Sequence, residues 1–180
     1  MNAGFKCAAI LPTGDEILSG IVQDTDSPMA AGVLRRLWPD CRITHETPVS
    51  DVQQSIRMRI ERAAAENDLV LIIGGSGGGH RFSSTLACDY THSAMEKLLS
   101  PCCAVSLYGK NGHLWSRLVC GRLHGALVLN LPGPFCEAQA AMQAFEQAWR
   151  QGTPTLKSLN HAMALAVQSQ YGASPTTVSP

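Results

Sequence analysis

The segment Asp68-Leu69-Val70-Leu71-Ile72-Ile73-Gly74-Gly75-Ser76-Gly77-Gly78-Gly79 decides how the rest of the chain is read. Its first half is short, almost wholly apolar and rich in β-branched types, which is typical of a strand that is covered on both faces in a parallel sheet. Its second half has five glycines in six positions, so the backbone can adopt positive φ angles and turn N–H groups toward an anion. The segment predicts a phosphate-binding loop, although a flexible glycine-rich surface loop fits the same residues.

The residues after the glycines extend this prediction. Ser83, Ser84 and Thr85 can supply hydroxyl groups to a ligand or cap the next helix. Neither standard nucleotide-binding fingerprint fits, because no Gly-Lys-Ser/Thr ending is present and the Gly-x-Gly-x-x-Gly match is loose and lies in the middle of the chain. We therefore expect a phosphate cradle that belongs to neither standard class.

Composition limits the class of protein. The 180 residues suit one domain with a sizeable core, and 14 basic residues balance 14 acidic ones, so neither nucleic acid nor a membrane surface is an expected partner. No apolar run approaches the roughly 20 residues of a membrane span, and the amino terminus lacks signal-peptide features, so we expect a cytoplasmic protein with a small ligand. The seven cysteines show no C-x-x-C spacing, and most of them are expected to be small buried hydrophobes.

Apolar periodicity predicts alternating strands and helices along the chain. Further strands are expected at residues 6–12, 42–49, 103–108, 115–120 and 126–131, and the turn at 109–112 marks a hairpin. One helix should begin near Asp26 or Ser27, and Ser50 should cap another whose apolar stripe is Val52, Ile56, Ile60 and Ala63. The pattern predicts a three-layer α/β/α fold, with a doubly wound, mainly parallel sheet, a late antiparallel hairpin and ligands at the carboxyl ends of the strands.

The chain changes character after this region. We expect an α/β domain over residues 1–152, a helical extension over 153–172 and a disordered tail over 173–180, which is rich in Ser, Thr and Pro. The apolar stripe of the extension, between Leu156 and Val167, must be covered by something. It can pack on its own domain or on a neighbouring subunit, and the sequence leaves both alternatives open.

Five motifs in a fixed order carry a resemblance to a known family. They are Thr13-Gly14-Asp15-Glu16-Ile17-Leu18-Ser19-Gly20 with Gln23-Asp24-Thr25-Asp26, then Val49-Ser50-Asp51, the glycine segment, Ser116-Arg117-Leu118-Val119-Cys120-Gly121 and Leu129-Asn130-Leu131-Pro132-Gly133-Pro134. Together they resemble the molybdopterin-binding domain family of the MoaB/Mog type. That family includes molybdopterin adenylyltransferase, the matching domain of molybdopterin molybdenumtransferase and the competence-damage-type domain.

The resemblance implies a binding site for molybdopterin and ATP with Mg²⁺, and an oligomer, most simply a trimer. The cofactor-binding residues it implies, together with those that chemistry suggests beside them, are Thr13, Gly14, Asp15, Glu16, Gly74, Gly75, Ser76, Gly77, Gly78, Gly79, Arg81, Ser84, Pro132 and Gly133. Asp51 is the implied catalytic and metal-binding carboxylate, because Mg²⁺ prefers oxygen ligands. The alternative for Asp51 is a first-turn acid that complements the helix dipole, and for Asp15 and Glu16 it is an exposed turn.

One departure from the family pattern divides the functional hypotheses. The adenylyltransferase-like branch continues the glycine loop into Arg-Asp-x-Thr, with a catalytic aspartate, whereas this chain has Arg81-Phe82-Ser83-Ser84. In one hypothesis Asp89, within Asp89-Tyr90-Thr91, replaces the missing acid and the protein transfers an adenylyl group to molybdopterin. In the other, the protein is a non-catalytic binder of a pterin or nucleotide, with His80 and Arg81 as binding groups.

Overall fold

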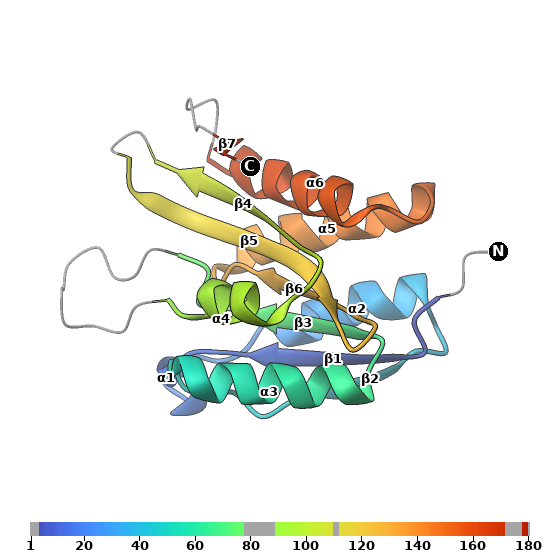
Figure 1. Ribbon diagram of the computed structural model, residues 1–180, viewed down its shortest axis with the longest axis horizontal. Coiled ribbons are helices and arrows are strands. Elements are labelled where there is room, and N and C mark those ends of the chain that lie inside the picture. Colours follow the sequence, from blue (N-terminus) through green and yellow to red (C-terminus); the bar gives the residue numbers. More distant parts are fainter. Residues whose placement is uncertain (1–3, 78–88, 110–111, 172–177, 180) are drawn as a thin grey trace.

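A single mixed sheet runs through the middle of the protein, with strand order β2-β1-β3-β6-β5-β4-β7 (Figure 1). The computed structural model describes residues 4–77, 89–109, 112–171 and 178–179. The strands are β1 (Cys7–Pro12), β2 (Arg42–His45), β3 (Leu69–Ile73), β4 (Cys102–Tyr108), β5 (Leu114–Leu123), β6 (Ala126–Leu131) and β7 (Val178–Ser179). Strands β2, β1, β3 and β6 are parallel, and β5, β4 and β7 add antiparallel pairs, which confirms the predicted doubly wound sheet with a late hairpin.

Helices cover both faces of the sheet (Figure 1). The helices are α1 (Asp15–Leu18), α2 (Asp26–Leu37), α3 (Gln53–Glu66), α4 (Thr91–Leu98), α5 (Phe135–Gln151) and α6 (Leu156–Ser169). Along β1, Ala8 and Ile10 join the core cluster formed with α2, α5 and α6, whereas Ala9 and Leu11 join the cluster formed with α3 and α4. Because side chains of a strand alternate between faces, this near-continuous apolar strand feeds both cores.

The C-terminal helix α6 packs on its own domain. Leu159, Met163 and Val167 are almost completely buried and belong to the core cluster shared with α5 and the sheet. Asn160 fixes the helix to the strands, because its Nδ2 donates to the backbone oxygens of Leu118 (3.0 Å) and Cys103 (3.3 Å). The apolar stripe therefore needs no neighbouring subunit, and the expected oligomer rests on the family resemblance alone.

Four rings form an aromatic corner at the end of the molecule where β1 begins. Its members are Phe5, Trp38, Phe145 and Trp149, and Trp38 contacts all three others with ring centroids 4.7–6.1 Å apart. The Trp38 contacts are edge-to-face, with interplanar angles of 74–82°. Trp38 and Trp149 therefore pack against other aromatic side chains.

Two local predictions are wrong. Ser50 does not cap the helix that follows it: α3 begins at Gln53, Val52 is its N-cap, and Val52 is 52% exposed and so lies outside the buried stripe. The reason is a tight turn, in which the Val52 N–H donates to the Ser50 oxygen at 2.7 Å. Within the expected tail, the described residues Val178–Ser179 pair with β4 opposite Leu107 and Ser106.

Candidate functional site

Three loops meet where the parallel strands end. The Thr13 N–H donates to the Ile73 oxygen at 2.8 Å, and the Gly74 N–H donates to the Leu131 oxygen at 3.1 Å. The Gly14 N–H donates to the Val49 oxygen at 2.9 Å, which brings the segment before α3 to the same edge. The Thr-Gly, glycine-rich and Leu-Pro-Gly motifs, far apart in the sequence, are thus neighbours at the carboxyl ends of β1, β3 and β6, as the fold predicts.

The described glycines of the loop, Gly74, Gly75 and Gly77, leave no room for side chains. A Cβ atom at Gly74 would lie 2.7 Å from the Thr13 oxygen, and one at Gly75 would lie 2.3 Å from Thr91 Oγ1. At Gly77 it would lie 2.7 Å from Asp89 Oδ2. Gly74 and Gly75 also have φ angles of 98° and 60°, which favour glycine. This loop is packed against its surroundings, which argues against a loose surface linker.

The start of α4 is fixed to the end of β1 by buried hydroxyl groups. Thr13 Oγ1 donates to the Ile73 oxygen at 3.1 Å and lies 3.2 Å from Thr91 Oγ1, and Thr91 is fully buried. Because Asp89 precedes this anchored residue by two positions, its carboxylate is held beside Gly77. Asp89 is therefore at the site, at the amino-terminal end of α4 and outside the helix.

Asp51 is held by a reciprocal exchange with Asp15. The Asp15 N–H donates to Asp51 Oδ2 at 3.3 Å, and the Asp51 N–H donates to Asp15 Oδ1 at 3.2 Å. Asp51 precedes α3 and is not a first-turn acid of that helix, so the helix-dipole alternative is wrong. Burial raises the pKa of Asp51; the backbone hydrogen bond from Asp15 opposes the shift, and nearby carboxylates, including Asp89, add to it.

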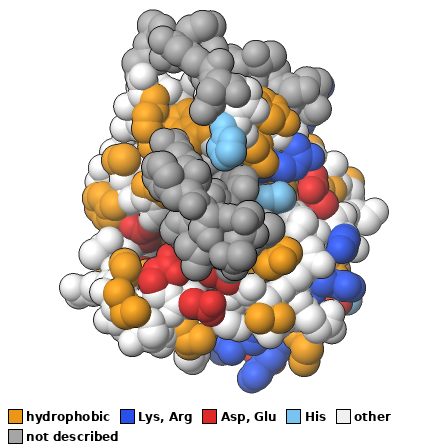
Figure 2. All heavy atoms as spheres, turned by 90° about the vertical axis from the view of Figure 1, so that its left-hand side faces the viewer, with side chains coloured by type: hydrophobic (Ala, Val, Ile, Leu, Met, Phe, Trp, Pro, Cys, Tyr) orange, Lys and Arg blue, Asp and Glu red, His pale blue; other side chains and the backbone are white. Residues whose placement is uncertain are grey.

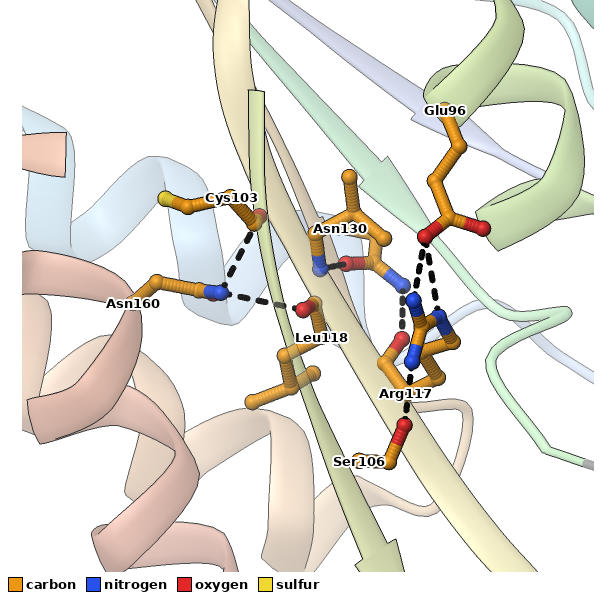
Figure 3. Close-up of polar contacts among 8 residues, drawn as sticks. Glu96, Cys103, Ser106, Arg117, Leu118, Asn130 and Asn160 are labelled. Carbon is orange, nitrogen blue, oxygen red and sulfur yellow. Dashed lines mark hydrogen bonds and ion pairs between the residues drawn. The ribbon is translucent and has the colours of Figure 1, made fainter. Parts of the chain in front are cut away.

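The Ser-Arg motif on β5 supports the glycine loop, and Asn130 on β6 holds the adjoining part of β5 (Figure 3 shows the Asn130 contacts). The Arg117 N–H donates to the Ser76 oxygen at 2.7 Å, and Ser116 Oγ donates to Ser76 Oγ at 3.2 Å. The side chain of Asn130 makes hydrogen bonds to the backbone of β5, as a neighbouring strand would. Its Oδ1 accepts from the Val119 N–H at 2.6 Å, and its Nδ2 donates to the Arg117 oxygen at 3.0 Å. These side chains position the loop through the sheet.

The three loops enclose a pocket of about 640 Å³. The predicted residues that line it are Thr13, Gly14, Glu16, Asp51, Gly74, Gly75, Ser76, Gly77, Asp89 and Gly133. Asp15 and Pro132 are not among the lining residues, and Asp15 acts through its exchange with Asp51. Gly78, Gly79, Arg81 and Ser84, together with His80, lie outside the described residues.

Two acidic residues that were not predicted as site residues form one wall of this pocket. Asp24 and Asp26 both line it, and Asp24 Oδ1 caps α2 by accepting from the N–H groups of Asp26 (3.2 Å) and Ser27 (2.9 Å). Asp26 is only 6% exposed, and burial, aided by the charge of Asp24, raises its pKa to about 6. Both residues belong to Gln23-Asp24-Thr25-Asp26, part of the first family motif, and that position could have identified them from the sequence.

A second wall joins distant parts of the chain. Trp115 and Tyr171 pack edge-to-face with ring centroids 4.0 Å apart, and the Tyr171 hydroxyl donates to Glu137 Oε1. All three residues line the pocket, together with Phe135 at the start of α5. Trp115 thus packs against Tyr171 and also faces the site. No local pattern reveals this wall, because its residues come from β5, α5 and the chain just after α6.

The pocket is acidic. Its carboxylates are Glu16, Asp24, Asp26, Asp51, Asp89 and Glu137, and none of its described lining residues is Lys or Arg (Figure 2 views this end of the molecule, with acidic side chains in red). Within the described ranges, no three His, Cys, Asp or Glu side chains are close enough to hold a metal ion.

Comparison with known proteins identifies a family for most of the chain. A family model described as "Probable molybdopterin binding domain" matches residues 9–152, well over half of the chain. A CinA-like protein of Anaeromyxobacter sp. (strain K) is 41% identical over 69 residues, which are 38% of this chain and 16% of that protein. The chain therefore spans only a small part of this relative.

Solved structures share the fold at low identity. Tungsten cofactor synthesizing protein MoaB from Pyrococcus furiosus is 15% identical, with a TM-score of 0.64 over 91% of this chain and 99% of that one. Molybdopterin biosynthesis enzyme MoaB from Thermus thermophilus is 22% identical, with a TM-score of 0.56 over 91% and 97%. Among the described residues, no helix is long and apolar enough to cross a membrane.

Proposed function

Because this chain belongs to the molybdopterin-binding domain family, we propose that its pocket binds the phosphate of molybdopterin at the glycine loop and that the protein transfers an adenylyl group from ATP to molybdopterin. One observation carries the catalytic part of this proposal. Asp51 and Asp89 line one pocket, and Asp89 lies against Gly77 although the family's loop aspartate is absent from the sequence. This placement favours the hypothesis in which Asp89 replaces that acid.

The proposed reaction is a displacement at phosphorus. A phosphate oxygen of molybdopterin attacks the α-phosphorus of ATP, a new P–O bond forms, the bond to the β-phosphate breaks, and pyrophosphate leaves. Mg²⁺ bound with ATP would supply positive charge to the triphosphate, and the carboxylates of Asp51 and Asp89 are suitable oxygen ligands for it. The positive φ angles of Gly74 and Gly75 turn the loop backbone in a way that would let its N–H groups face the phosphates.

Two substitutions test the catalytic assignment. We expect Asp51→Asn and Asp89→Asn each to lower turnover by about 10²–10⁴-fold while leaving molybdopterin affinity nearly unchanged, since both remove charge needed mainly in the transition state. The measurement is AMP transfer to molybdopterin, with molybdopterin and ATP also titrated separately. Asp40→Asn is the matched control, because Asp40 is exposed and follows α2 at the other end of that helix. Adenylyl transfer that is unaffected by Asp51→Asn would contradict the role of Asp51.

A binder without catalysis is the second candidate, and the Arg81-Phe82-Ser83 sequence favours it because it lacks the aspartate of the related enzymes. In that case, wild-type protein binds molybdopterin or a nucleotide without AMP transfer. Arg81→Ala and Gly77→Ala then weaken binding, the second because its Cβ would displace the Asp89 carboxylate. For either candidate, assembly as a homotrimer is a proposal from the family resemblance.

A further inference from the structure

Two cysteines face each other across β4 and β5, away from the pocket. Cys103 is paired in register with Cys120, and both lie on the sheet face that packs against α5 and α6. Directly opposed residues of antiparallel strands have Cα atoms about 4.5 or 5.5 Å apart, and both separations lie within the range of about 4.4–6.8 Å found for disulfides. Cys103 Sγ already donates to the Cys120 oxygen at 3.4 Å. A disulfide between them requires no change of strand register.

A groove of about 700 Å³ leads to one of these cysteines. It runs beside β4 and is lined by Cys102, Cys103, Lys157, Asn160 and His161, among others. Figure 3 shows the Cys103 sulfur on the α6 side of β4, with Glu96 and Arg117 on the opposite side. Cys120 is fully buried, so a reagent in the groove reaches Cys103 first.

The charges around the groove favour an anionic reagent. Arg117 and Glu96 line it as an ion pair with a 2.5 Å separation, so they largely neutralise each other. Lys157 and His161, both on α6, are the remaining titratable cationic groups among its described lining residues. The neighbouring Cys120 side chain lowers the pKa of Cys103, burial opposes this shift, and the charge of Lys157 assists it. The positive charge of Lys157 favours the thiolate, which is the nucleophilic form of Cys103.

We propose that Cys103 and Cys120 form a thiol–disulfide exchange site that takes a small anionic disulfide of the glutathione type through this groove. In the first step the Cys103 thiolate attacks one sulfur of the reagent, a mixed disulfide forms, and the other half leaves as a thiolate. In the second step the Cys120 thiol loses its proton to the released thiolate and attacks Cys103 Sγ. A Cys103–Cys120 disulfide forms, the bond between Cys103 Sγ and the reagent sulfur breaks, and the second half of the reagent leaves as a thiolate, so two electrons pass from the cysteine pair to one reagent disulfide.

The test treats the full chain with oxidised glutathione and follows intact and peptide masses without reducing agent. Wild-type protein should pass through a glutathionyl adduct on Cys103 and accumulate a Cys103–Cys120 disulfide, with two hydrogens fewer than the reduced protein. Cys120→Ala should stop at the adduct, and Cys103→Ser should leave Cys120 unmodified. Lys157→Gln should slow the first step several-fold, since a nearby positive charge favours both the thiolate and the anionic reagent.

Cys102→Ser is the matched control, because Cys102 is exposed, adjacent in sequence and on the other face of β4. It should leave the formation of the Cys103–Cys120 disulfide unchanged. If Cys120→Ala does not fold, the time course of the wild-type protein still shows whether the Cys103 adduct precedes the disulfide. Modification of Cys102 while Cys103 and Cys120 both stay reduced would overturn the proposal, as would a disulfide that forms at the same rate in Cys103→Ser between other cysteines.

Discussion

The pocket and the aromatic corner stand at opposite ends of the same elements. β1 follows Phe5 of the corner and ends beside Thr13 of the pocket, whereas α2 begins at Asp26 of the pocket and ends before Trp38 of the corner. The helix α5 likewise begins at the pocket and carries corner rings in its later turns. Since the elements are shared, the difference between the two ends lies in their side chains: a cluster of four packed rings at one, and glycines, hydroxyls and carboxylates beside the Trp115–Tyr171 pair at the other.

This difference separates stability from function. Each aromatic ring can bury about 150–250 Å² and gains further from edge-to-face contact, so the corner should contribute strongly to the free energy of unfolding. The pocket end instead carries backbone in positive-φ conformations and a buried carboxylate, Asp26, both of which cost stability. A residue at the corner should therefore affect folding more than ligand binding, and a residue at the pocket should affect binding at least as much as folding.

The largest effect is expected at Phe145. Phe145→Ala removes a fully buried ring and should lower the free energy of unfolding by about 3–5 kcal/mol, because a cavity adds to the lost transfer energy. Urea unfolding measures this loss, and ligand affinity of the folded fraction should stay unchanged. Phe135→Ala is the comparison variant: Phe135 is 43% exposed and lines the pocket, so it should cost little stability and weaken binding. If Phe135→Ala costs as much stability as Phe145→Ala, the division between the two ends is wrong.

The next effect is expected in the glycine loop. Gly75→Ala should destabilise the protein by about 2–3 kcal/mol and lower ligand affinity at least tenfold, because its Cβ would overlap Thr91 Oγ1 and its φ is unfavourable for alanine. Gly125→Ala is the matched control, since Gly125 also has a positive φ, of 90°, but nothing within 4 Å of the added Cβ. It should cost only about 1 kcal/mol of strain and leave affinity unchanged. Equal effects of both substitutions would show that backbone strain, and not close packing, decides the role of Gly75.

Much of the fold could be predicted from local patterns. Apolar runs predict the buried strand at Leu69–Ile73 and the strand at Ala126–Leu131, and turn residues predict the hairpin before Leu114. The start of α3 could not be predicted, because Ser50 is a good cap in isolation, whereas the exchange between Asp15 and Asp51 fixes a turn at that point. The contact between Asp15 and Asp51, which are 36 residues apart in the sequence, therefore outweighs the local preference of Ser50 for a helix cap.

The site divides in the same way. Residues of the loops that end β1, β3 and β6 were predicted because parallel strands bring their carboxyl ends to one edge. Trp115, Glu137 and Tyr171 were missed, since only the packing of α6 on the domain brings Tyr171 to Trp115. The cross-strand pair of Cys103 and Cys120 was likewise beyond sequence spacing, because it depends on the register of β4 against β5.

The smallest predicted effect compares one carboxylate from each end through the pH dependence of stability. The folded pKa of Asp26 is about 6, above its ordinary value of 3.8, so the folded state binds more protons between these values and Asp26 lowers stability as pH rises through this range. Asp26→Asn should therefore have almost no effect near pH 3.5 and raise the free energy of unfolding by about 1–2 kcal/mol at pH 7.

Glu146 of α5, which lies between two corner residues in the sequence, should change stability with pH in the opposite direction. Hydrogen bonds from Arg36 and Arg150 lower its pKa to about 2. The stabilising contribution of Glu146 is present above about pH 4.5 and is lost as pH falls toward 2. Glu146→Gln should therefore destabilise the protein slightly at pH 7 and progressively less in acid. The change should be smaller than that of Asp26→Asn, because both arginines are exposed. Urea unfolding at a series of pH values measures both curves, and an Asp26→Asn curve that runs parallel to that of Glu146→Gln would show that Asp26 is not a buried, proton-binding acid of the pocket wall.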